Sequence, residues 1–233
     1  MFTSERKSDI EALLTKISSQ FSEIESQYRA SLEKRQISSE LKVEVKNFLE
    51  NARSVLDYCA HEIGQKIGLP ENQNIYFPVV EKNAQEANFK GSIGRSLPGL
   101  ETKAATIYQY LESIQPYHSG YAWIVDFATI AAENKHTQLT PQKRFETEMV
   151  VSKSENGGTA AWNPSAVRFG AGVFINGAAV NSHSQLPEKV SGVTVTKEIW
   201  VDFTFDDGNS VLSLLRTIKE QLPLIVLEIE KLV

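Results

Sequence analysis

Apolar residues recur every three or four positions through the first part of the chain, which is the spacing of one face of an α-helix. Neither Gly nor Pro occurs between Met1 and Ile63, so long uninterrupted helices are favoured there. Ser8 with Glu11 three residues later is a capping box that predicts the start of the first helix. Its apolar stripe is narrow, as in an antiparallel hairpin or a coiled-coil seam, and consists of Ile10, Leu13, Leu14, Ile17, Phe21, Ile24, Tyr28 and Leu32.

A second helix follows, with Ser38 or Ser39 as its predicted N-cap. Gly64, Gly68 and Pro70 mark its end. The residues predicted to form its core face are Leu41, Val45, Phe48, Leu49, Ala52, Leu56, Cys59 and Ile63.

Residues 70–98 read as a polar connector that contains several glycines and prolines and the apolar patch 75–80. A third helix is expected over 100–114, ended by Pro116. The fourth helix, from about Tyr121 to Lys135, is apolar almost all round, which predicts a place in the middle of a bundle.

After Pro141 the apolar period changes from that of a helix to the alternation of a half-buried strand, beginning at Phe145. Asn176-Gly177 lies between two apolar stretches and predicts a hairpin, because both turn residues need a positive φ. Further strand pattern covers 193–205, and Ser210–Val233 is an apolar helix in which Pro223 predicts a kink.

These elements predict an α+β protein. Residues 1–140 form an antiparallel helical bundle, and residues 141–233 form a small antiparallel β-rich unit with a C-terminal helix that packs back on one of the two parts.

Composition adds few constraints. With 41% hydrophobic and 23% charged residues the chain is of ordinary globular composition. No apolar run is long enough to span a bilayer, the first residues are polar, and Cys59 is the only cysteine, so we expect a cytoplasmic protein without membrane contact or disulfide. The net charge of −5 is spread over both parts, which argues against generic DNA coating but leaves open a local pocket for RNA or a nucleotide.

The main candidate for a functional site is one polar stripe on the second helix. Arg53, Asp57 and His61 recur at intervals of four residues, so the stripe runs from the flank of the core face to its back. Two interpretations are open. The stripe is either a solvated helix face with an incidental ion pair, or a cluster that holds a ligand.

A second polar group, Asn134-Lys135-His136, ends the apolar fourth helix. The helix dipole favours cations at this position. Since the helix is expected to be buried, we predict that Asp57 pairs with Lys135 or His136 and that these residues form one network with Arg53 and Asn134.

Several short motifs resemble an uncharacterised bacterial family whose helical part is similar to the HEPN (higher-eukaryote and prokaryote nucleotide-binding) superfamily. The motifs are Asn51-x-Arg53-Ser54-x-Leu56-Asp57-Tyr58, Phe77-Pro78, Leu97-Pro98-Gly99-Leu100, Gln115-Pro116-Tyr117 and Asn134-Lys135-His136, and they cover about Leu41 to Leu139. The resemblance implies an antiparallel, often dimeric helical bundle with roles in RNA cleavage, toxin systems or phage defence.

Catalytic members of that superfamily carry an Arg that grips phosphate and, after four to six residues, a His that helps to activate the 2′-hydroxyl. Arg53 and His61 are the matching pair here, although the seven residues between them exceed that interval. The leading prediction is therefore a defence-associated accessory protein that binds RNA, a nucleotide or a protein partner, with Asp57, Asn134, Lys135 and His136 as ligand-binding residues. A metal-independent ribonuclease using Arg53 and His61 is the alternative, and a non-catalytic oligomerisation or interaction module is the third.

The stripe of the first helix and the resemblance together predict a homodimer. No cofactor is expected. No metal site is expected either, since the four histidines show no ligand spacing.

Overall fold

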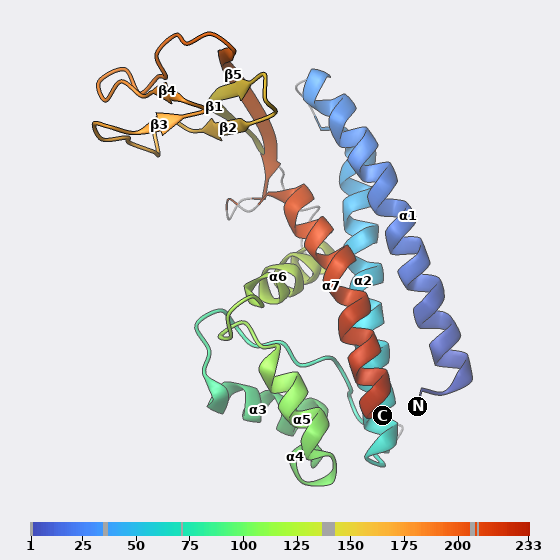
Figure 1. The fold of residues 1–233 in the computed structure, drawn as a ribbon. Helices are drawn as coiled ribbons and strands as arrows, with labels where there is room; N and C mark the ends of the chain where they lie inside the picture. The colour runs from blue at the N-terminus through green and yellow to red at the C-terminus, as the bar shows by residue number, and fades with distance from the viewer. Residues whose placement is uncertain (1, 35–36, 71, 137–142, 206–207, 209) are drawn as a thin grey trace. The chain divides into compact units, whose positions relative to one another are not determined.

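A computed structural model describes residues 2–34, 37–70, 72–136, 143–205, 208 and 210–233, without the side chains of residues 32–34, 133–136 and 199–201. The chain forms two compact units (Figure 1). The helical unit comprises residues 1–142 and 204–233, and the β unit comprises residues 143–203. The protein is thus α+β, as the sequence predicts.

The helical unit begins with a long antiparallel hairpin. Its helices are α1 (Ser4–Lys34), α2 (Ser39–Lys66), α3 (Glu86–Ser96), α4 (Leu100–Lys103), α5 (Ala105–Ser113), α6 (Ala122–His136) and α7 (Val211–Leu232). All eight residues predicted for the core face of α2 are buried, and Ser38 caps the helix by accepting a hydrogen bond from the Leu41 N–H. Those predictions are confirmed.

The start of α1 differs from the prediction. The helix begins at Ser4 rather than at Ser8, because Thr3 is anchored at the far end of α2. The Thr3 N–H and hydroxyl both donate to the buried Glu62 carboxylate, at 2.9 and 2.7 Å. The Lys7 N–H then donates to the Thr3 carbonyl and closes the first turn. A contact far away in the sequence, which local capping rules do not detect, therefore sets this end.

The closing helix α7 belongs to the helical unit, whereas the sequence analysis grouped it with the β-rich residues 141–233. Ser210 caps it by accepting from the Ser213 N–H, and Pro223 lies inside it. One face of α7 is buried along its whole length, and α7 packs against α1 and α2. Helix α1 accordingly packs on α2 and α7 of the same chain, which accounts for the burial of its stripe residues Ile10, Ile17, Phe21, Ile24 and Tyr28 without a second copy.

Two features of residues 70–136 depart from the pattern. The predicted connector contains α3, whose glycines Gly91 and Gly94 are exposed while Phe89 and Ile93 are buried. Helix α6 packs on α2 and α7 with Ile124, Phe127 and Ile130 buried, yet its other face is exposed at Ala122, Thr129 and Ala132, so it does not lie in the middle of the bundle. The sequence of α6 is apolar almost all round because the alanines on its exposed face also count as apolar residues.

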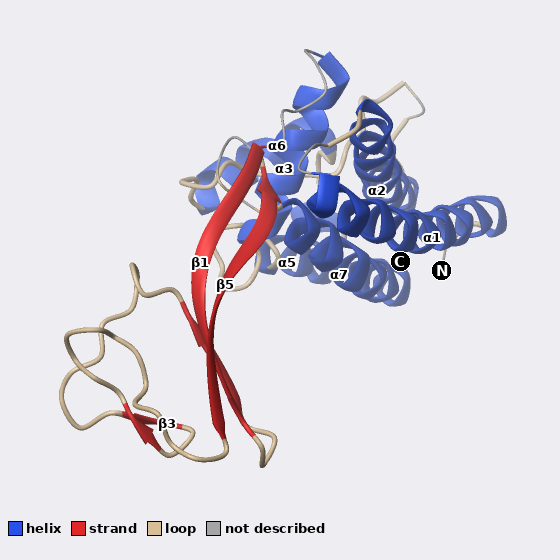
Figure 2. Cartoon of the chain, turned by 90° about the horizontal axis from the view of Figure 1, so that it is seen from above, coloured by secondary structure: helices blue, strands red, loops and turns tan. Residues whose placement is uncertain are grey.

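The β unit contains the strands β1 (Lys143–Ser154), β2 (Thr159–Trp162), β3 (Phe174–Ile175), β4 (Ala178–Ala179) and β5 (Val193–Thr204). The larger sheet has the order β2-β1-β5, with β1 and β2 antiparallel and Val150 opposite Trp162. Figure 2 shows its two long strands, β1 and β5, side by side. The predicted hairpin is confirmed: β3 and β4 pair around Asn176 and Gly177, whose φ angles are 52° and 82°. Phe145, expected on the buried face of β1, is 57% exposed.

Candidate functional site

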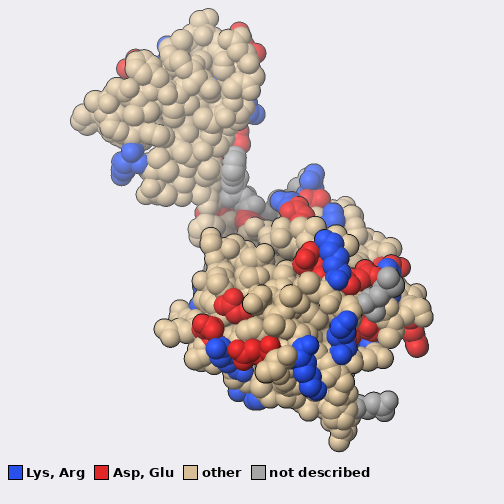
Figure 3. Space-filling view, turned by 60° about the horizontal axis from the view of Figure 1, so that its bottom comes forward, with Lys and Arg blue, Asp and Glu red and all other residues tan. Residues whose placement is uncertain are grey.

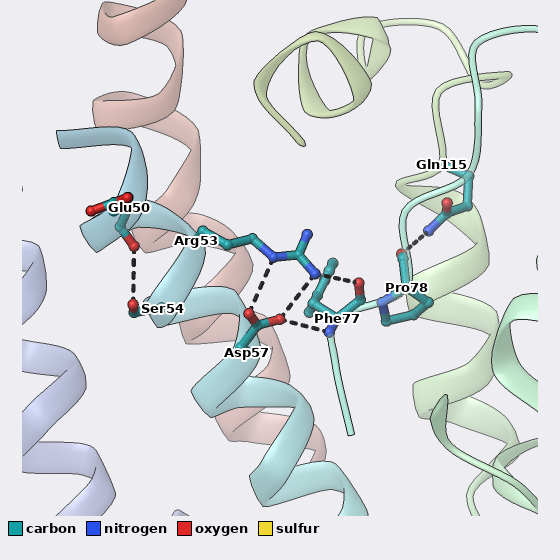
Figure 4. A network of polar contacts seen from close by, with 7 residues as sticks. All are labelled: Glu50, Arg53, Ser54, Asp57, Phe77, Pro78 and Gln115. Carbon is teal, nitrogen blue, oxygen red and sulfur yellow. Dashed lines mark hydrogen bonds and ion pairs between the residues drawn. The ribbon is translucent and has the colours of Figure 1, made fainter. Parts of the chain in front are cut away.

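The site centres on an ion pair within α2. The core face of this helix turns toward α1, α6 and α7, which leaves Arg53 and Asp57 on its flank, one turn apart. The Arg53 guanidinium meets the carboxylate through two nitrogens: Nε lies 3.2 Å from Oδ2 and Nη2 lies 3.0 Å from Oδ1 (Figure 4). The side chains are 26% and 32% exposed, so water still reaches the pair.

Both members of the pair also bind the backbone of one connector residue. The Phe77 N–H donates to Asp57 Oδ1 at 2.9 Å, and Arg53 Nη2 donates to the Phe77 carbonyl at 3.2 Å. The two side chains thus satisfy the donor and the acceptor of Phe77 as a neighbouring strand would. The Phe77 ring is fully buried, so this grip fixes where the connector enters the core.

A second grip on the same connector comes from Gln115, which is fully buried just after α5. Its Nε2 donates to the Pro78 carbonyl at 3.1 Å, and its Oε1 accepts from the Val80 N–H at 3.2 Å. Three of the short motifs that carry the family resemblance, 51–58, 77–78 and 115–117, therefore meet around one segment. Here the motif residues have a structural explanation, because they satisfy buried backbone groups.

A pocket of about 590 Å³ opens beside this clamp, between α2 and α6. Its α2 wall is polar, with Glu50 and Ser54 beside Arg53 and Asp57, and its α6 wall consists of Ala128, Ala131 and Ala132. Figure 4 draws Nε and Nη2 of Arg53 with hydrogen bonds or ion pairs and Nη1 with none to the other residues shown. Among the described residues, the pocket thus combines an apolar wall with a guanidinium nitrogen that has no partner.

Among the described side chains beside this pocket, the charges are paired. Lys46 pairs with Glu50 at 3.1 Å and Arg53 pairs with Asp57, so each of these carboxylates has its own cation. On the face of the helical unit that Figure 3 shows, basic and acidic side chains are likewise interspersed. Neither feature provides the concentrated positive field that would hold a nucleic-acid backbone.

His61 lies in a different place from Arg53. It lines a second pocket, of about 390 Å³, together with Tyr58 of α2 and with Thr3, Glu5, Arg6 and Asp9 at the start of α1. Eight residues of helix place His61 about 12 Å further along α2 than Arg53. The structure therefore does not bring together the two residues expected to be catalytic. Arg6 is the arginine that shares a pocket with His61, and its guanidinium is bound to Glu62.

Asn134, Lys135 and His136 form the last turn of α6, and their side chains lie outside the described residues. Their contact with Asp57 stays a prediction. The other acidic residue near the end of α2, Glu62, is bound to Thr3 and Arg6.

Sequence reasoning missed the alanine wall of the first pocket. Its signal was present in the spacing of Ala128, Ala131 and Ala132, which places three small side chains on one face of a helix otherwise rich in large residues. The pattern did not reveal this wall, because alanine counts as apolar and the three alanines were therefore grouped with the buried residues of the helix.

Burial makes Cys59 unsuitable as a nucleophile. The side chain is fully buried, and burial raises the pKa of its thiol, so it remains protonated and unreactive.

Within the described ranges, no group of three or more His, Cys, Asp or Glu side chains could hold a metal ion. Among the same residues, no helix combines the length and the apolar character that a membrane crossing needs.

No family model, curated protein or solved structure matches this chain. The resemblance to the HEPN superfamily consequently remains a prediction from the short motifs alone.

Proposed function

We propose that the helical unit is a non-catalytic binding domain whose alanine-walled pocket takes a nucleoside group, either from a free nucleotide or from an unpaired base of RNA. The observation that carries the proposal is the combination of that wall with Arg53 Nη1, which has no partner among the described residues. Ligand sites typically enclose about 300–1,000 Å³ and pair an apolar surface with a few polar groups, and this pocket falls within that range.

The alanine wall suits a planar ring. Three small side chains on neighbouring turns leave a shallow, even surface against which a base can lie. Opposite it, the Glu50 carboxylate and the Ser54 hydroxyl offer hydrogen bonds to ring or sugar groups. Ser54 already donates to the Glu50 carbonyl, which leaves its oxygen available as an acceptor.

The absence of catalysis is proposed because the expected catalytic pair is divided. Arg53 holds Asp57 and Phe77, and His61 lines another pocket. A ribonuclease needs its phosphate-gripping and proton-transferring groups at one scissile bond. A role in phage defence and a homodimer, both implied by the resemblance, stay predictions alongside this one.

Calorimetric titration of the full chain with the common ribonucleoside monophosphates and a short single-stranded RNA tests the proposal. We expect saturable binding that Ala132→Leu weakens by at least about tenfold, since the added side chain fills the pocket mouth. Ala122→Leu is the matched control, because Ala122 is an exposed alanine of the same helix that does not line the pocket. Equal binding by both variants, or none by the parent chain, would refute the proposal.

The ribonuclease alternative is tested in the same preparation with labelled RNA and no added metal. The proposal expects intact RNA. Cleavage that His61→Ala abolishes, in a protein that keeps its melting temperature, would establish the alternative instead.

A further inference from the structure

We infer that the pocket between α2 and α6 recognises the uncharged part of its ligand, the base and the sugar, and holds no phosphate group. The inference rests on the proposed function and narrows it to ligands whose affinity does not depend on phosphate.

The first reason is the occupied guanidinium of Arg53. A phosphate is gripped strongly when two parallel N–H groups of one guanidinium edge point at two of its oxygens. Here Nε donates to Asp57 Oδ2, and Nη2 serves both Asp57 Oδ1 and the Phe77 carbonyl. Both edges that include Nε or Nη2 are thereby used within the protein. Of the three guanidinium nitrogens, only Nη1 has no partner among the described residues, and this one nitrogen can make single hydrogen bonds but cannot grip a phosphate through two nitrogens.

The second reason is the charge of the wall. Lys46 and Arg53 are matched by Glu50 and Asp57, and the carboxylates themselves line the pocket. A phosphate placed here would gain little net attraction and would approach two negative groups at close range. A neutral ring meets no such repulsion.

The decisive experiment is a phosphate series. A nucleoside that shares its base with the tightest monophosphate of the panel is titrated alongside its mono-, di- and triphosphate, at physiological salt and with a chelator so that no metal bridges the phosphates. We expect dissociation constants that agree within about threefold, or that rise with phosphate number. A bound phosphate would instead tighten binding by at least about tenfold.

Failures of the two proposals are distinguishable. If nothing in the series binds, or if Ala132→Leu binds like Ala122→Leu, the proposed function fails and the inference falls with it. If binding depends on the pocket but tightens tenfold or more with added phosphate, the function stands and the inference is wrong.

Lys135→Ala then identifies the source of such tightening, because Lys135 follows Ala131 by one turn of α6. Tightening that this variant removes would assign the phosphate contact to Lys135 and overturn the inference. A series that stays flat in the parent chain and in Lys135→Ala supports it.

Discussion

Two arginine–carboxylate pairs with a carboxylate on α2 differ in their burial and in the elements that they join. Arg6 reaches from α1 to Glu62, across 56 positions of sequence, and the Glu62 side chain is 3% exposed. Arg53 and Asp57 lie one turn apart on a single helix, and each remains about a quarter to a third exposed. The first pair joins two helices, and the second holds the connector and leaves one guanidinium nitrogen, Nη1, without a partner among the described residues.

The difference teaches that burial, rather than the presence of an ion pair, decides how much a charge contributes. Glu62 is surrounded by donors: the Thr3 N–H, the Thr3 hydroxyl and the Arg6 guanidinium. Hydrogen bonds to charged groups contribute more than neutral ones, and exposed ion pairs contribute little. The end of α2 near Glu62 is therefore the structural anchor, whereas the middle of α2 at Arg53 is the part to which the proposed function assigns ligand binding.

The largest expected effect is that of Glu62→Ala. Removing the carboxylate leaves the start of α1 without its anchor and frees Arg6, so the free energy of unfolding should fall by about 3 kcal/mol. Chemical denaturation followed by circular dichroism measures it. Glu11→Ala, which removes an exposed carboxylate of α1, is the control and should change stability by less than about 0.5 kcal/mol. Similar losses in both variants would contradict the anchor.

Asp57→Ala should have a smaller effect, about 1–2 kcal/mol, because water can replace part of what Arg53 and the Phe77 N–H lose. Asp57→Asn keeps an acceptor for that N–H and should recover about half of the loss. Amide exchange at Phe77 should accelerate in the Ala variant more than in the Asn variant. A loss as large as that of Glu62→Ala would erase the contrast between the two pairs.

The smallest expected effect is the pH dependence that the Glu62 carboxylate gives to stability. Burial raises the pKa of the Glu62 carboxyl, but hydrogen bonds from Thr3 and Arg6 outweigh it, and the pKa ends below its ordinary value. Its stabilising contribution is therefore complete above the ordinary glutamate pKa of about 4.3 and is lost as the pH falls through the lower, folded-state pKa. The melting temperature of the parent chain should drop over that acidic range more steeply than that of Glu62→Gln. Parallel curves would contradict the prediction.

The fold could be predicted where pattern and packing agree. Every predicted core residue of α2 is buried, and Asn176-Gly177 forms the expected turn, because periodicity and turn geometry are local properties. The start of α1 and the existence of α3 escaped prediction. In α1 a distant carboxylate overrides the local cap, and in α3 the buried Phe89 and Ile93 outweigh two glycines.

The site could be predicted only in part. The spacing of Arg53 and Asp57 predicts their ion pair, which the structure contains. Their grip on Phe77 could not be predicted, since it joins residues 20 and 24 positions apart and depends on how the connector folds back. The motif resemblance pairs Arg53 with His61. The eight positions that separate them along α2 instead place the two residues in separate pockets.

The hairpin of the β unit contains a residue that is prone to spontaneous deamidation. Asn176 Nδ2 donates to the Ser152 carbonyl and hydroxyl and to the Gly158 carbonyl, so the amide faces three oxygens. Asparagine followed by glycine is the sequence most prone to spontaneous deamidation, which replaces that nitrogen with a negatively charged oxygen. Since a carboxylate can only accept hydrogen bonds, it would repel the Ser152 and Gly158 carbonyls, and of the three present partners only the Ser152 hydroxyl could donate to it. Deamidation of Asn176 would therefore cost the hairpin its two hydrogen bonds to backbone carbonyls of residues 152 and 158, so the turn that forms the hairpin is also the position at which slow chemical damage would weaken its attachment.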